Sequence, residues 1–146
     1  MRKKPLETRS TAFPRRFAAV LYDSLLITGM LFPITLILIW IRGGTAFSPG
    51  DRLFEGIIAL TSWAFHVWFW THGGQTLGMK AWGIKIEDTS GRSVNAATAS
   101  KHFLLGVLLC LPFGLGWWWS ILDPHHRSLQ EILSGTRIVR HRPPGH

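Results

Sequence analysis

Four ionisable residues lie within or beside the long apolar stretches of this 146-residue chain. Arg16 and Asp23 stand seven residues apart at the start of the first stretch, His66 lies near the end of the second, and Asp123 follows the third. A charge in hydrocarbon costs about 2.5 to 3.5 kcal/mol on insertion scales, so it usually has a partner or faces water. A buried carboxylate beside an imidazole could bind a proton or a hard cation, or it could hold helices together.

The spacing of these residues predicts how they meet. Seven residues make about 700° of helix, so Arg16 and Asp23 share a face but lie ~10 Å apart along the axis, and each needs a partner elsewhere. Asp23 and His66 reach a similar depth if their helices are antiparallel spans. We therefore predict one cluster at the inner leaflet, with Asp23 between Arg16 and His66 and with Arg16 bound bidentately to Asp123. The alternative for His66 is a hydrogen bond to a backbone carbonyl.

Three further ionisable residues are secondary candidates for the same cluster. Glu55 shares helical spacing with Ala59, Ser62 and His66, which predicts a narrow polar or small face on the second helix. The other two candidates, Arg127 and Glu131, belong to the stretch that follows Asp123.

The elements that must position these residues are three apolar stretches, 17–41, 53–71 and 103–122. Charged residues make up only 16% of the chain, against about 25% in soluble domains. The first two stretches are long enough to cross a hydrocarbon core of about 30 Å. A proline and two glycines near the middle of the third predict a break. The expected fold class is an all-α membrane protein with two transmembrane helices and a third, broken segment.

The positive charges predict the orientation of the chain. Six of its sixteen basic residues precede the first stretch, in a tail of residues 1–16, and only Arg42 and Arg52 lie between the first two stretches. This asymmetry predicts a multi-pass protein of the inner membrane with a cytoplasmic N-terminus.

The basic residues of 72–102 and of the tail 140–146 also favour the cytoplasm, so we expect the third segment to re-enter. A kinked ordinary span is the competing interpretation. The net charge of +8 then faces anionic lipid headgroups, not nucleic acid.

The segment between the second and third stretches is expected on the cytoplasmic side. Its sequence AWGIKIEDTSGRSV, residues 81–94, alternates apolar and polar positions and then carries turn residues. This pattern predicts a short amphipathic hairpin or an irregular loop. The single cysteine, Cys110, lies in an apolar run, so no disulfide framework is expected.

Three motifs resemble the RDD family of small membrane proteins, which is named for one arginine and two aspartates. RFAAVLYD, from Arg16 to Asp23, matches the opening of that family's first helix. The middle motif resembles GGQTLGMKAWGIKIEDTSGR, and the closing motif resembles LDPHHRSLQEILSGTRIV, which includes Asp123. The resemblance implies one membrane domain, residues 17–139. It also implies the functions suggested for relatives, which are ligand transport and exchange of sodium for protons.

One adjacent pair of positions departs from the family pattern. Relatives usually carry His-Asp before the final amphipathic stretch, whereas this chain has Gln130 and Glu131. Glu131 keeps the carboxylate on a side chain one methylene longer. Gln130 cannot titrate as a histidine would.

Three functions follow from these residues. The first is a structural or accessory membrane subunit, in which the charged cluster fixes the helices and the partners are lipid and a second copy or a larger membrane protein. The second is an oligomeric transporter that exchanges a monovalent cation for protons. The third is a metal or haem site built from histidines, although no recognised ligand spacing is present. We expect no enzyme activity and no cofactor, because the sequence shows no nucleophile–base set and no phosphate loop.

Overall fold

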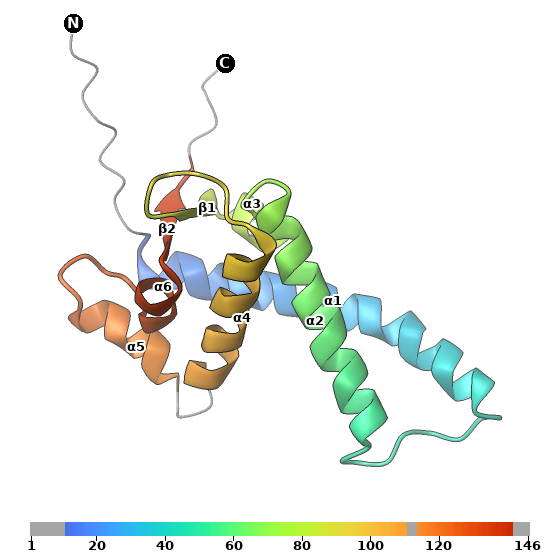
Figure 1. The fold of residues 1–146 in the computed structure, drawn as a ribbon. Coiled ribbons are helices and arrows are strands. Elements are labelled where there is room, and N and C mark those ends of the chain that lie inside the picture. The colour runs from blue at the N-terminus through green and yellow to red at the C-terminus, as the bar shows by residue number, and fades with distance from the viewer. Residues whose placement is uncertain (1–10, 111–113, 142–146) are drawn as a thin grey trace, which may run out of the picture.

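The computed structural model describes residues 11–110 and 114–141 (Figure 1). These residues form six helices and one two-stranded sheet. In chain order the elements are α1 (Phe13–Ile41), α2 (Arg52–Thr71), α3 (Leu77–Ala81), β1 (Ile84–Asp88), α4 (Ala96–Cys110), α5 (Leu115–Leu122), α6 (Leu129–Ser134) and β2 (Thr136–Arg140).

Helix α1 is the main apolar element. Pro14 lies in its first turn, where a missing N–H is tolerated. Its buried residues are Arg16, Ala19, Asp23 and Ile27, whose spacing places them along one stripe. Among the described helices only α1 is by itself long and apolar enough to cross a membrane. The stretch predicted as the second span forms the 20-residue helix α2, but α2 does not reach the same combination of length and hydropathy as α1.

The third apolar segment is broken, as its proline and glycines predict. Helices α4 and α5 meet at 95°, and taken together they have the length and composition of one broken span or one re-entrant loop. Gly114, which precedes α5, has a φ of 70°, a left-handed conformation that glycine adopts without strain. Pro112 lies outside the described residues. Helix α4 also begins at Ala96, seven residues before the predicted boundary at residue 103.

The expected local hairpin in 81–94 is wrong. Strand β1 pairs antiparallel with β2, near the other end of the chain, with Ile86 opposite Ile138. The alternation did identify a strand, because Ile84 and Ile86 are buried in the core. The turn after β1 also forms, since the Asp88 carboxylate accepts hydrogen bonds from the N–H groups of Ser90 and Arg92. The fold is therefore mainly helical with a small sheet, and not all-α.

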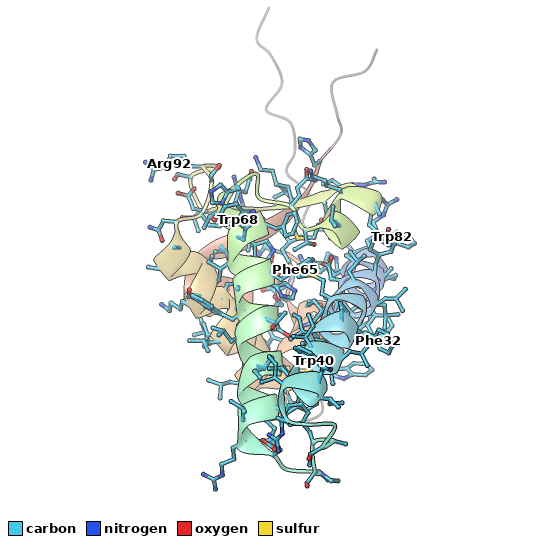
Figure 2. All side chains as sticks on the ribbon, turned by 90° about the vertical axis from the view of Figure 1, so that its right-hand side faces the viewer. Phe32, Trp40, Phe65, Trp68, Trp82 and Arg92 are labelled. Carbon is cyan, nitrogen blue, oxygen red and sulfur yellow. The ribbon has the colours of Figure 1, made fainter. Side chains whose placement is uncertain are left out.

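The core lies at one end of α1 and α2, beneath the sheet. It consists of apolar residues from α1, α2, α3, α4, β1 and the segment before α4: Ala19, Val67, Trp70, Met79, Ile84, Ile86, Val94 and Ala99. Away from this end the apolar side chains are exposed, and Phe32 and Trp40 on α1 are 66% and 81% accessible (Figure 2). The two ends of the described chain meet at the core end, where Thr11 donates two hydrogen bonds to the carbonyl of Ile138.

Candidate functional site

A buried ion pair joins the beginning of α1 to the beginning of α6. The guanidinium of Arg16 binds the carboxylate of Glu131 through both of its terminal nitrogens, and the second contact, from Nη2 to Oε1, measures 3.3 Å. Both residues are buried, with accessibilities of 6% for Arg16 and 0% for Glu131. The contact is bidentate, the arrangement that best matches a guanidinium to a carboxylate.

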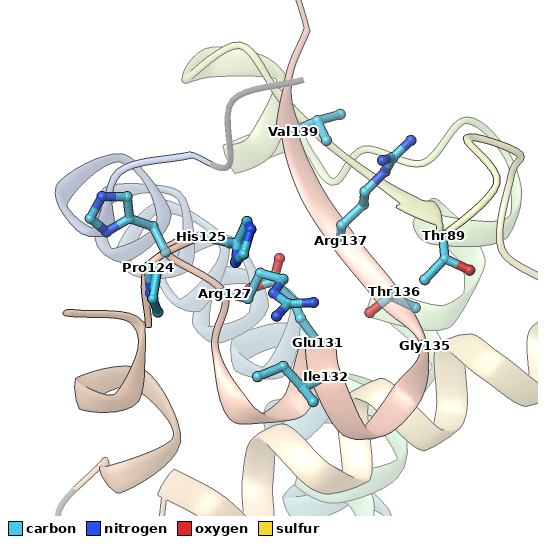
Figure 3. Close-up of a pocket in the computed structure, with 11 residues that line it drawn as sticks. Thr89, Pro124, His125, Arg127, Glu131, Ile132, Gly135, Thr136, Arg137 and Val139 are labelled. Atoms are coloured by element: carbon cyan, nitrogen blue, oxygen red, sulfur yellow. The ribbon is translucent and has the colours of Figure 1, made fainter. Parts of the chain in front are cut away.

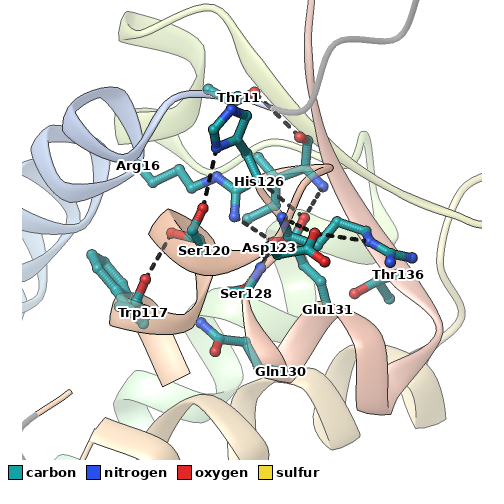
Figure 4. Close-up of polar contacts among 12 residues, drawn as sticks. Thr11, Arg16, Trp117, Ser120, Asp123, His126, Ser128, Gln130, Glu131 and Thr136 are labelled. Atoms are coloured by element: carbon teal, nitrogen blue, oxygen red, sulfur yellow. Dashed lines mark hydrogen bonds and ion pairs between the residues drawn. The ribbon is translucent and has the colours of Figure 1, made fainter. Parts of the chain in front are cut away.

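Local sequence also fixes the position of the Glu131 carboxylate. Ser128 and Glu131 form a capping box, the S-x-x-E signature of a helix start. The backbone N–H and the hydroxyl of Ser128 each donate to Glu131 Oε2 at 2.7 Å (Figure 4). The N–H of Ile138 in β2 donates to Oε1 at 2.6 Å. Each carboxylate oxygen of Glu131 therefore accepts at least two hydrogen bonds from the protein itself.

The Asp23 carboxylate holds α3 against the middle of α1. Its two oxygens accept hydrogen bonds from the Thr76 hydroxyl at 2.5 Å and from the Gly78 N–H at 2.8 Å. Thr76 is also the N-cap of α3, because its side chain accepts from the N–H of Met79. A Cβ at Gly78 would lie 2.2 Å from the carbonyl oxygen of Ala19, so only glycine permits this approach. Asp23 is 2% accessible.

A third buried polar contact joins α4 to the end of the chain. The Nδ1 atom of His102 lies 3.1 Å from the hydroxyl of Ser134 and 2.8 Å from that of Thr136. Because Ser134 ends α6 and Thr136 begins β2, this contact fixes the turn between them against α4.

These three contacts border one cavity of about 250 Å³, which we call the central cavity. Arg16, Asp23, His66, His102 and Gln130 contribute to its lining. Apolar side chains from α1, α2, α4 and α5 make up most of the remainder. The buried polar groups thus surround an apolar space.

The predicted pairing of Arg16 with Asp123 is wrong. Arg16 binds Glu131, and Asp123 instead accepts from the backbone N–H of Arg127 at 2.9 Å and from its side-chain Nε at 3.3 Å. The hydrogen bond from the Arg127 backbone, with smaller contributions from its side chain, holds the pKa of Asp123 below its usual range. Asp123 ends α5, so a local partner four residues ahead reaches it more easily than Arg16 does.

The predicted pair between Asp23 and His66 is also not formed within the described residues, because Asp23 binds Thr76 and Gly78. The Nδ1 atom of His66 instead donates to the carbonyl of Ser62 at 2.8 Å, one turn earlier in α2. Both side chains nevertheless line the central cavity. Glu55 is exposed in the first turn of α2 and lies apart from them.

A second pocket, of about 700 Å³, opens beside the loop before α6 (Figure 3). Its lining includes His125, His126, Arg127 and Arg137, together with Glu131. Arg137 is bound to Glu87 at 2.9 Å, and Arg127 is bound to Asp123. The described residues include no group of three His, Cys, Asp or Glu side chains placed to bind a metal.

Several residues of the site were not assigned from the sequence. Thr76 and Gly78 lie within the quoted middle motif, yet nothing in their types pairs them with Asp23. The S-x-x-E pattern of Ser128 and Glu131 was a readable signal for a helix start. His102 carries no distinguishing pattern, because a single histidine near an apolar run is common.

The sequence model of the RDD family matches residues 11–135. The chain belongs to the RDD family. No curated protein and no solved structure matches the chain. Membership of the RDD family and the long apolar α1 are consistent with a membrane protein. Both residues of the buried ion pair, Arg16 and Glu131, lie within the matched region.

Proposed function

We propose that this RDD-family chain is an integral protein of the inner membrane that serves as a structural or accessory subunit. In this proposal the Arg16–Glu131 pair and the Asp23 contacts lock α1 to the elements on the cytoplasmic side. The central observation is that the Glu131 carboxylate is saturated by Arg16, Ser128 and Ile138. A carboxylate that exchanges protons or cations needs an oxygen open to water or to the ion. Glu131 at 0% accessibility is better suited to holding elements together.

The outer part of α1 supports an accessory role. From Thr28 to Ile41 none of its residues is buried, although most are apolar. Apolar surface of this extent must be covered by lipid or by another membrane protein. A second copy of the chain or a larger partner would pack against this helix.

The proposed topology places both ends of the described chain in the cytoplasm. The basic residues before α1 and after α6 favour that side, and Thr11 is hydrogen-bonded to Ile138. Ser10→Cys and Gly145→Cys, each in a Cys110→Ala background, test it with an impermeant thiol reagent on intact cells. We expect labelling only after permeabilisation. Labelling of Gly145→Cys in intact cells would require a third full span.

Paired substitutions at Arg16 and Glu131 test the lock. Removing one member of a buried ion pair leaves the other charge unpaired and typically costs about 3 to 5 kcal/mol, whereas replacing both with apolar residues is often nearly neutral. We expect Arg16→Met and Glu131→Leu each to lower the abundance and melting temperature of the purified protein. The double variant should recover part of both, because it contains no unpaired charge but still leaves the Ser128 and Ile138 donors without the Glu131 acceptor.

The pair of Asp123 and Arg127 provides the control, because its arginine side chain is 44% exposed although its aspartate is only 10% exposed. An ion pair with an exposed partner contributes about 1 kcal/mol or less, and Asp123 keeps the hydrogen bond from the Arg127 backbone N–H, so Arg127→Met should change abundance and melting temperature little. If the double variant of Arg16 and Glu131 is as unstable as either single variant, the two residues do not act as one pair. If the single variants are fully stable, the lock is wrong.

A second function, exchange of a monovalent cation for protons, is supported by one observation. Asp23 and His66 line the same cavity, and buried carboxylates bind hard cations. The measurement is cation-dependent proton flux in proteoliposomes. Under this proposal Asp23→Asn abolishes the flux while the protein stays folded. Under the structural proposal neither the wild type nor the variant shows cation-dependent flux.

A further inference from the structure

The central cavity has an unused hydrogen-bond acceptor. Gln130 is 5% accessible, and its side-chain Oε1 is buried with no hydrogen-bond partner among the described residues. This oxygen lies against α5, since a Cβ at Gly116 would be 2.8 Å from it. A buried acceptor without a partner has lost its hydrogen bonds to water and gained none from the protein. The position therefore favours a molecule that donates a hydrogen bond to Gln130.

The charged groups around the cavity already have partners within the protein, so they do not require an ionic ligand. The Arg16 charge is balanced by Glu131, and the Asp23 oxygens accept from Thr76 and Gly78. The hydroxyls of Ser120 and Ser128 donate to Trp117 and Glu131. A neutral ligand fits this set, because an ion would need a further counter-charge in a low-dielectric space.

The cavity opens toward the apolar surface between α1 and α4. Val20 of α1 and Val107 of α4 line the cavity and are 40% and 48% accessible. Gly106 lines the same side, and a Cβ built there meets no atom within 4 Å. A ligand that enters here comes from the lipid phase.

We propose that the central cavity binds a small neutral amphiphile, with one hydroxyl bonded to Gln130 and an apolar chain directed between α1 and α4. A volume of about 250 Å³ lies just below the range of about 300 to 1,000 Å³ that holds drug-sized ligands, so the occupant is a short-chain molecule. This site goes beyond the proposed structural role, but it rests on the proposed placement of the chain in a membrane.

The single cysteine provides the reporter. Cys110 is free and exposed, and it lines the cavity, so bimane attached there senses occupancy of the cavity in nanodiscs. The probes are 1-octanol and n-octane, compared at equal mole fraction in the lipid. Both molecules dissolve in the bilayer, so their difference reports the hydroxyl. We expect a saturable bimane shift with 1-octanol and a response to n-octane that is about five- to tenfold weaker, the effect of one hydrogen bond.

Two variants and one control locate the effect. Gly106→Leu fills open space in the cavity and should abolish the octanol response. Gln130→Leu removes the acceptor and should weaken octanol binding about five- to tenfold, to the level of octane. Gly29→Leu makes the same substitution on α1, where a Cβ also meets no atom within 4 Å, and should respond as wild type does. Monodisperse elution on size exclusion establishes that each variant is folded.

Several outcomes would overturn the proposal. A bimane shift that rises linearly with octanol, or that is equal in Gly106→Leu and Gly29→Leu, would mean that octanol acts only through the bilayer. Equal saturable responses to octanol and octane would show a hydrocarbon site in which Gln130 has no part. A shift produced by sodium chloride alone, and blocked by Asp23→Asn, would identify an ion as the occupant.

Discussion

The two ends of helix α1 have similar apolar sequences but very different environments. Between residues 11 and 27 the chain buries Arg16, Asp23 and Ile27, whereas no residue from Thr28 to Ile41 is buried. Helix α2 divides in the same way, since its buried residues begin only at Phe65. The difference is that residues 11–27, which we call the packed end, meet α3, α6 and the sheet; residues 28–41 form the outer end. Buried polar groups, and not a more apolar sequence, thus distinguish the packed end from the outer end.

Among the substitutions that compare the two ends of α1, the largest effect is expected from a glycine that contacts the packed end. Gly78→Ala places a methyl group 2.2 Å from the Ala19 carbonyl, which forces α3 away from α1 and breaks the Asp23 contacts. We expect the free energy of unfolding to fall by about 3 kcal/mol, measured by thermal melting in detergent.

Gly29→Ala is the control from the outer end of the comparison. A Cβ there meets nothing within 4 Å, and alanine is the better helix former by about 0.5 to 1 kcal/mol. Gly29→Ala should therefore leave the melting temperature unchanged or raise it. A similar loss for both alanine variants would contradict the packed contact at Gly78.

The next largest difference between the two ends of α1 is expected when an aliphatic side chain is replaced with alanine. Ile27 is 8% accessible and Leu36 is 52% accessible. Ile27→Ala opens a void among packed side chains and should cost about 2 kcal/mol. Leu36→Ala changes a side chain that the described residues leave exposed, so the isolated chain should lose less than about 0.5 kcal/mol. Equal losses in chemical unfolding would remove the distinction between the ends.

Asp23→Asn should have a smaller effect on stability. The amide keeps one oxygen for the Gly78 N–H but loses the acceptor for the Thr76 hydroxyl, which corresponds to about 1 kcal/mol. Hydrogen exchange at Gly78 and Met79 measures whether α3 stays docked. Thr76→Val removes the same hydrogen bond and also the N-cap of α3, so it should cost more than Asp23→Asn. If Asp23→Asn is the more damaging of the two, Asp23 has a role beyond this contact.

The smallest effect is confined to the exposed turn after β1. Hydrogen bonds from the backbone of Arg92 and the side chain of Ser90 lower the pKa of Asp88 from 3.8 to about 2. Because the folded pKa is lower, the stabilisation of the turn is complete above about pH 4 and is lost as the pH falls toward 2. Slow exchange of the Ser90 and Arg92 amides should follow this window. Asp88→Ala should abolish the pH dependence without changing the core.

Sequence reasoning recovered what is periodic and local in this fold. The spacing of Arg16 and Asp23 predicted one shared face, and the proline and glycines predicted the break between α4 and α5. The alternation of Ile84 and Ile86 predicted a strand. None of these patterns carries information about a distant partner. Strand β1 pairs with β2, and Arg16 pairs with Glu131, because the chain returns through α4 and α5 to the same end of α1.

The question of which carboxylate binds Arg16, Asp123 or Glu131, shows most clearly that local patterns do not identify distant partners. Both are carboxylates after the third apolar segment, and composition does not separate them. Their local geometry does, since Asp123 accepts from Arg127 at the end of α5, whereas Glu131 lies in the first turn of α6. The S-x-x-E signature of Ser128 and Glu131 was the one local signal that placed a preorganised carboxylate at a helix start.

The separation of Arg16 from Glu131 has a consequence for biogenesis. The two residues are 115 positions apart, and ribosomes add about 5 to 20 residues per second, so Arg16 emerges roughly 6 to 23 seconds before its partner. During that interval Arg16 lacks the carboxylate of Glu131. In the proposed membrane placement, we expect Arg16 to stay at the lipid–water boundary until α6 arrives. Docking of the packed end of α1 therefore depends on completion of the distal segment, which supplies the carboxylate that binds Arg16.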